Sequence, residues 1–104
     1  MNAKKALAIA IRHSTDSTKE DIKRIKEAIR TNAKKGLGFI RITQDLEQKK
    51  YSDFARKENT GELETIYINN LSTLVKQWII SEGYSMQGAW SDLIIVIAFC
   101  NRVI

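Results

Sequence analysis

Three stretches of the chain carry apolar residues at the spacing of an α-helix. The first covers residues 3–14, the second runs from about residue 17 to about residue 35, and the third covers residues 63–82. Gly36 and Gly83 follow the second and third stretches, where a glycine often ends a helix by taking a left-handed conformation. The pattern therefore predicts three helices. The buried stripe predicted for the second helix contains Ile22, Ile25, Ile29 and Ala33.

A short segment after the second helix has the two-residue period of a β-strand. In "GFIRIT", Phe39 and Arg41 point to one side, while Ile40 and Ile42 point to the other. We expect a strand of the sheet here, with its isoleucines in the core.

The region between this strand and the third helix is polar and contains few apolar residues. Leu46 and Phe54 have a spacing that would let a short helix dock on the core. This segment is the optional fourth helix of the predicted fold.

The end of the chain predicts two further strands, at residues 84–86 and 90–100, joined by a tight turn at Gln87-Gly88. The predicted fold is a single α+β domain over residues 1–104. It has a small three-stranded sheet and three to four helices in the order α-α-β-(α)-α-β-β.

The last predicted strand is apolar on both faces from Leu93 to Phe99, which is typical of a central strand covered on both sides. Helices on one face of a small sheet leave its other face bare. Either the helix at residues 3–14 or a second copy of the chain must cover that face. We expect a homo-oligomer formed through the C-terminal strand region.

The chain contains few residues of the types that form catalytic and metal sites. His13 lies at the expected end of the first helix, where a histidine acts as a cap. The single cysteine, Cys100, lies at the end of a strand that we expect to be buried, and zinc would need more Cys and His ligands than the chain offers. We expect a protein that is not an enzyme and that has no catalytic residues, metal or cofactor.

No stretch of the sequence is apolar over the roughly 20 residues that span a bilayer. The apolar run at residues 6–11 is also too short for the core of a secretory signal. We expect a cytoplasmic protein without a membrane partner.

The net charge of +5 is concentrated in the first half of the chain. Residues 1–52 contain 13 Lys and Arg against 6 Asp and Glu, whereas residues 53–104 contain 4 against 6. Five of these cations recur every three or four residues on the second helix, which places them within an arc of roughly 80°. They are Lys19, Lys23, Lys26, Arg30 and Lys34, and together they are called the basic stripe.

The basic stripe has two interpretations. It is either a solvated face partly neutralised by Glu20 and Glu27, or a surface that binds the phosphates of a nucleotide or nucleic acid. Like charges at this spacing repel one another, so the stripe adds no stability to the helix.

Four residues outside the second helix are further candidates for the ligand site. Tyr51 and Phe54 stand among cations in "KKYSDFARK", where aromatic rings would serve either for base stacking or for docking on the core. Arg41 would add a planar bidentate phosphate contact. Trp90 follows the predicted turn and would be an exposed residue or a lid over a pocket.

The order of a helix ending in "NAKKG", a β-like segment, a long helix ending in "SEGY" and an apolar C-terminal strand resembles small proteins encoded by tailed bacteriophages. The resemblance covers most of the chain. It implies an accessory, host-takeover or anti-defence factor that binds rather than catalyses, often as a homo-oligomer. Some such proteins sequester nucleotide signals of bacterial immune systems. No functional residue carries over from it.

The leading hypothesis is therefore a phage-encoded binding protein that captures a phosphate-bearing nucleotide through the basic stripe and its neighbours. The first alternative is a nucleic-acid-binding host-takeover protein that uses the same stripe. The second is a protein inhibitor whose basic surface docks on an acidic host enzyme.

Overall fold

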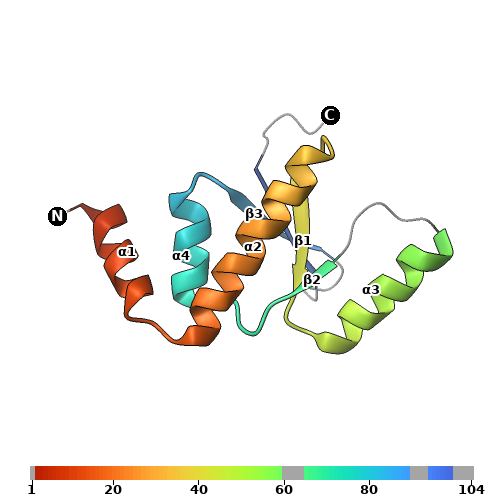
Figure 1. The fold of residues 1–104 in the computed structure, drawn as a ribbon, viewed down its shortest axis with the longest axis horizontal. Coiled ribbons are helices and arrows are strands. Elements are labelled where there is room, and N and C mark those ends of the chain that lie inside the picture. The colour runs from red at the N-terminus through yellow and green to blue at the C-terminus, as the bar shows by residue number, and fades with distance from the viewer. Residues whose placement is uncertain (1, 60–64, 90–93, 100–104) are drawn as a thin grey trace.

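Four strands form one mixed sheet in the order β2-β1-β4-β3 (Figure 1), in a computed structural model that describes residues 2–59, 65–89 and 94–99. The strands of this described part are β1 (Phe39–Thr43), β2 (Thr65–Tyr67), β3 (Ser85–Ala89) and β4 (Ile94–Ala98). β1 pairs in parallel with β2 and antiparallel with β4, which in turn pairs antiparallel with β3. The α+β class is confirmed, with one strand more than predicted.

The helices of the described chain are α1 (Ala3–Arg12), α2 (Asp16–Lys34), α3 (Leu46–Asn59) and α4 (Thr73–Ser81). Their starts are set by side-chain caps. The side chains of Asn2, Thr15 and Ser72 accept hydrogen bonds from the first turns of α1, α2 and α4. Gly36 and Gly83 have φ angles of 81° and 88°, which confirms the predicted left-handed ends of α2 and α4.

The helix predicted at residues 63–82 is wrong in its first part. Thr65–Tyr67 is the strand β2, and α4 begins only after Ser72. The isoleucines Ile66 and Ile68 fit a strand as well as a helix. Pairing with β1 decides between the two, and the Ile68 backbone N–H donates to the Thr43 carbonyl at 3.0 Å.

The turn predicted at Gln87-Gly88 is also wrong. Both residues lie inside β3, where they pair with Val96 and Ile95 of β4. A glycine next to an alternating segment resembles a turn signal in the sequence, but here β4 supplies a full ladder of partners.

The core lies between the sheet and the helices α2 and α4 (Figure 1). Its fully buried isoleucines and valine are Ile25 of α2, Val75 and Ile79 of α4, Ile40 and Ile42 of β1, Ile97 of β4, and Ile68 just after β2. This confirms the predicted burial of Ile40 and Ile42. Along the predicted α2 stripe, Ile22 is also buried, Ile29 is half-buried and Ala33 is exposed.

The prediction of a central C-terminal strand is confirmed, since β4 lies between β1 and β3. Arg41, Val96 and Gln87 pair side by side across β1, β4 and β3, on the face opposite Ile40 and Ile97.

This second face is not covered by α1. That helix packs against α4 and α2 at the far side of the helical layer (Figure 1). α3 packs against β2 and β1 on the same side of the sheet as α2, since its Lys49 lines a hollow together with residues of α2 and with Ile66. Thr43, Thr65 and Ile94 are buried, whereas Val96 and Ala98 are half-buried. Covering of this face by a second copy of the chain stays a prediction.

Candidate functional site

The basic stripe is fully displayed on α2. Each of its five side chains, Lys19, Lys23, Lys26, Arg30 and Lys34, is exposed. From Lys19 to Lys34 the stripe extends along the helix axis for about 22 Å, at about 1.5 Å per residue. It is therefore a long, narrow band of positive charge rather than a compact cluster.

The charges of the basic stripe are not compensated by acids within the described parts of the chain. None of its members forms an ion pair there. Glu20, which one of the two interpretations had partly neutralising the stripe together with Glu27, pairs with Arg24, with Oε1 2.6 Å from Nη2. All five cations of the stripe are therefore left without a paired acid among the described residues.

One member of the stripe connects it to aromatic side chains. The Lys26 ammonium lies 5.6 Å from the ring centre of Trp78, which is within the range of a cation–π contact. Trp78 meets Tyr84 edge-on with ring centres 6.1 Å apart, and Tyr84 meets Phe99 at 6.4 Å. Trp78 is buried, while Tyr84 and Phe99 are half-buried. Together these three rings are called the aromatic row.

The aromatic row was not foreseen as a neighbour of the stripe. β-sheet pairing builds it: Ser85 pairs with Ala98, so the residues just outside this pair, Tyr84 and Phe99, face each other. Trp78 joins from α4. The sequence gives little indication of the aromatic row, because the local pattern around each aromatic residue predicts only a core residue of its own helix or strand.

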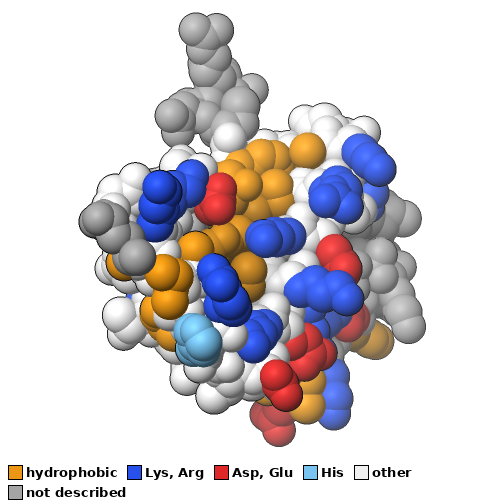
Figure 2. Space-filling model, turned by 60° about the vertical axis from the view of Figure 1, so that its left-hand side comes forward, with side chains coloured by type: hydrophobic (Ala, Val, Ile, Leu, Met, Phe, Trp, Pro, Cys, Tyr) orange, Lys and Arg blue, Asp and Glu red, His pale blue; other side chains and the backbone are white. Residues whose placement is uncertain are grey.

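A hollow of about 260 Å³ lies beside the stripe, between α1, α2 and α4. It is lined by Lys4, Leu7, Ala8 and Ile11 of α1, Ile22 and Lys26 of α2, and Trp78, Ser81 and Glu82 of α4 and its C-cap. This space is called the α1 hollow. Figure 2 shows hydrophobic side chains in a depression on this side of the molecule, with Lys and Arg side chains around them.

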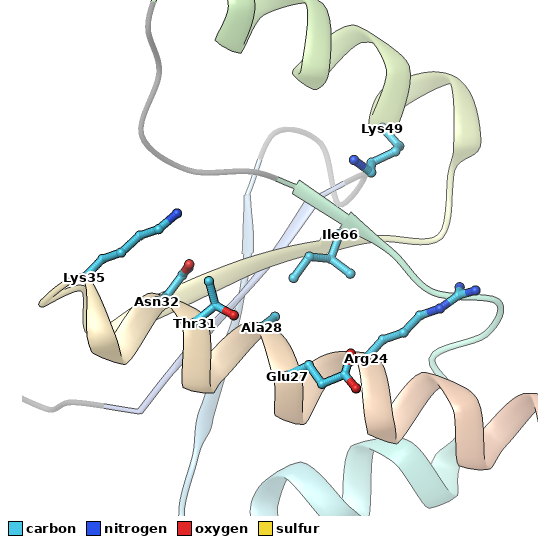
Figure 3. Close-up of a pocket in the computed structure, with 8 residues that line it drawn as sticks. All are labelled: Arg24, Glu27, Ala28, Thr31, Asn32, Lys35, Lys49 and Ile66. Carbon is cyan, nitrogen blue, oxygen red and sulfur yellow. The ribbon is translucent and has the colours of Figure 1, made fainter.

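A second hollow of about 250 Å³ lies on the opposite flank of α2, between α2, β2 and α3 (Figure 3). Its cations are Arg24, Lys35 and Lys49. Two of them are held by acids: Arg24 by Glu20, and Lys49 by Asp53, with its Nζ 2.8 Å from a carboxylate oxygen. Glu27 also lines this hollow. Its charges are therefore largely balanced, unlike those of the basic stripe.

The structure places Arg41 away from the basic stripe. It lies on the face of the sheet opposite the core, whereas α2 packs on the core side. Its side chain is partly buried, and this burial lowers the pKa of the guanidinium from its ordinary value.

Tyr51 and Phe54 also lie apart from the stripe, on α3 at the other end of the molecule (Figure 1). The prediction that Leu46 and Phe54 dock on the core is wrong, because their exposed fractions are 52% and 62%, and that of Tyr51 is 66%. α3 turns Lys49 and Asp53 inward, and this orientation leaves its large apolar side chains outside. Trp90 falls outside the described residues.

The described residues supply no metal cluster, since no three His, Cys, Asp or Glu side chains among them come together. His13 is the C-cap of α1, as predicted, and its side chain is exposed. Cys100 lies outside the described part. Of the helices that the structure describes, none has the length and hydropathy to cross a membrane.

Comparison of the chain with known proteins finds no match among family models, curated proteins or solved structures. The resemblance to small bacteriophage proteins therefore stays a prediction, and the function has to be argued from the site.

Proposed function

We propose that this protein is a nucleic-acid-binding protein that holds a phosphate backbone along the basic stripe. The observation that carries the proposal is a row of five exposed cations on one helix, none of them in an ion pair with a described residue. Their mutual repulsion weakens α2 when no anion is bound. A row of phosphates would remove that repulsion and release condensed counterions on binding.

The length of the stripe favours a nucleic acid over the single nucleotide of our leading hypothesis from the sequence. A mononucleotide would contact one or two of the cations, whereas a strand can follow all of them over about 22 Å. Beside the middle of the stripe, Lys26 also contacts the ring of Trp78 on α4, although that ring is itself buried. A cationic track that follows the backbone is what proteins use to bind nucleic acids without reading a sequence.

Fluorescence anisotropy with a short labelled oligonucleotide tests the proposal. If each of the five cations neutralises one phosphate of a single strand, log K should fall against log salt with a slope of about −3.5. A mononucleotide carries no condensed counterion atmosphere, so its binding should depend much more weakly on salt. No binding between about 50 and 200 mM salt would contradict the proposal.

An acidic protein could use the same cations, which is the inhibitor alternative from the sequence. Affinity capture from a nuclease-treated cell lysate separates the two. A retained acidic protein, together with no oligonucleotide binding, would overturn the nucleic-acid proposal.

A further inference from the structure

The α1 hollow lies directly beside the middle of the basic stripe, because Lys26 belongs to both. α1 packs on α2 and α4 only through partly buried side chains, and none of its residues is buried. Leu7 and Ile11 are half-buried and border the hollow. Apolar surface that is left half in water at this point gains free energy when a ligand covers it.

The size and lining of the hollow suit one planar ring. A dry apolar cavity of about 150 Å³ is enough to bind benzene, and the α1 hollow measures about 260 Å³. Its walls are mainly apolar, with Leu7 and Ile11 on one side and Ile22 and Trp78 on the other. The hollow therefore has room for a single aromatic ring with polar substituents.

The polar residues that line the hollow are exposed or half-buried and so lie toward solvent. The Ser81 hydroxyl donates to the Trp78 carbonyl at 2.8 Å and keeps an acceptor position for a further donor. Glu82 adds a carboxylate, which accepts hydrogen bonds, and Lys26 and Lys4 add donors. An apolar interior with donors and acceptors at the edge matches a nucleobase, whose faces are apolar and whose edges form hydrogen bonds.

We propose that the α1 hollow binds one unstacked nucleobase, so that the nucleic acid held by the basic stripe is a single strand. This inference rests on the proposed function and adds the class of ligand. The phosphate next to the bound base would lie at Lys23 and Lys26, and the base would turn toward α1 and cover Leu7 and Ile11. A base paired within a duplex is stacked in the helix and cannot enter the hollow without being flipped out.

The experiment compares three labelled probes of equal length at one salt concentration: a single strand, the corresponding duplex, and an abasic strand that keeps the phosphates without bases. The wild-type protein should bind the single strand about tenfold more tightly than the abasic strand, as expected for one stacked base. It should also bind the single strand more tightly than the duplex. Equal affinity for the single strand and the abasic strand would overturn the inference.

A filling substitution tests the position of the base. Ala8 is exposed and lines the hollow, so Ala8→Phe should place a ring there without changing any charge. The affinity for the single strand should then fall about tenfold, and the affinity for the abasic strand and the salt slope should stay unchanged. Ala6 is exposed on α1 outside the hollow, so Ala6→Phe is the matched control and should change neither affinity.

These outcomes separate the inference from the proposed function. If all three probes bind with similar affinity and Ala8→Phe has no effect, the stripe binds phosphates and the base site is wrong. If none of the probes binds, the proposed function itself is wrong. Binding of the abasic strand by Ala8→Phe also reports that the variant is folded.

Discussion

Asp21 of α2 accepts hydrogen bonds from both amide groups of Asn69. Its Oδ1 lies 2.8 Å from the Asn69 backbone nitrogen and 3.0 Å from Nδ2, and its Oδ2 accepts from the Asn70 backbone at 3.1 Å. Asp21 is almost completely buried. The carboxylate thus fastens the segment between β2 and α4 to α2, and it satisfies two backbone donors that no sheet or helix partner reaches.

Replacing this carboxylate should destabilise the fold. Asp21→Ala would leave the Asn69 and Asn70 backbone donors without their acceptor, and we expect a loss of about 3 kcal/mol in the free energy of unfolding. Urea denaturation followed by circular dichroism measures it. Glu27→Ala, an exposed acid on the same helix, should change the stability by no more than about 0.5 kcal/mol. Equal effects of the two substitutions would show that the Asp21 contacts carry little of the stability.

Neighbouring lysines at the end of α2 provide a matched test of the basic stripe. Lys34 belongs to the stripe, while Lys35 lines the hollow on the opposite flank, and both are exposed. In the oligonucleotide assay, Lys34→Gln should make the salt slope shallower by about 0.7, because one phosphate contact is lost. Lys35→Gln should leave the slope close to the wild-type value. A larger effect of Lys35→Gln would show that the phosphate backbone of the oligonucleotide lies on the opposite flank of α2, and would contradict binding along the basic stripe.

The aromatic row should contribute to stability through its edge contacts. Tyr84 meets both Trp78 and Phe99, so Tyr84→Leu removes two aromatic pairs at once. At about 0.5 to 1.5 kcal/mol for each pair, we expect a loss of about 2 kcal/mol in the free energy of unfolding. Tyr84→Phe keeps both aromatic pairs and should leave the free energy of unfolding nearly unchanged. Thermal or urea unfolding decides, and an equally large loss in Tyr84→Phe would assign the effect to the hydroxyl group instead.

The left-handed glycine at the end of α2 should tolerate only certain side chains. Gly36 has a φ of 81°, and a Cβ at this position would meet no atom within 4 Å, so backbone strain alone sets the cost. We expect Gly36→Val to lose about 1 to 2 kcal/mol of stability. Gly36→Asn should lose clearly less, because asparagine enters the left-handed region more readily. Comparable losses in both variants, measured by denaturation, would contradict a purely conformational role for Gly36.

Substitutions on the two faces of β4 test the predicted self-association. Ile97 is completely buried in the helical core, so Ile97→Lys should prevent folding by burying an unpaired charge. Val96 is half-buried on the opposite face, and Val96→Lys should fold. If a second copy covers that face, light scattering should show an oligomer for the wild type and a smaller species for Val96→Lys. A wild-type protein that is monomeric at high micromolar concentration would refute the self-association.

Local pattern was sufficient for the elements that depend on a single segment. The helical period identified α1 and α2, and the alternation in "GFIRIT" identified β1 and the direction of Ile40 and Ile42. The basic stripe was equally readable, since the α-helical turn of about 100° per residue places Lys19 and Lys34 on the same face whatever surrounds the helix.

Long-range pairing decided the elements for which the sequence was ambiguous. Thr65–Tyr67 became a strand because β1 offers it a parallel partner, and Gln87 and Gly88 became part of β3 because β4 offers them an antiparallel one. An isolated segment of three or five residues has no such partner, so its own propensity cannot decide its structure.

The sequence by itself determined which residues could bind phosphate on α2, because helical spacing places charges on one face without any tertiary contact. Only the tertiary structure decided which aromatic residues stand beside them. Tyr51 and Phe54 are close to cations along the chain, yet α3 carries them away from α2. Trp78 comes near Lys26 because α4 packs on α2, and Tyr84 meets Trp78 because it follows α4 at the start of β3. The physical reason is that tertiary packing is driven by the burial of apolar surface, and this burial depends on residues that are distant in the sequence. The period of a helix depends only on its own residues.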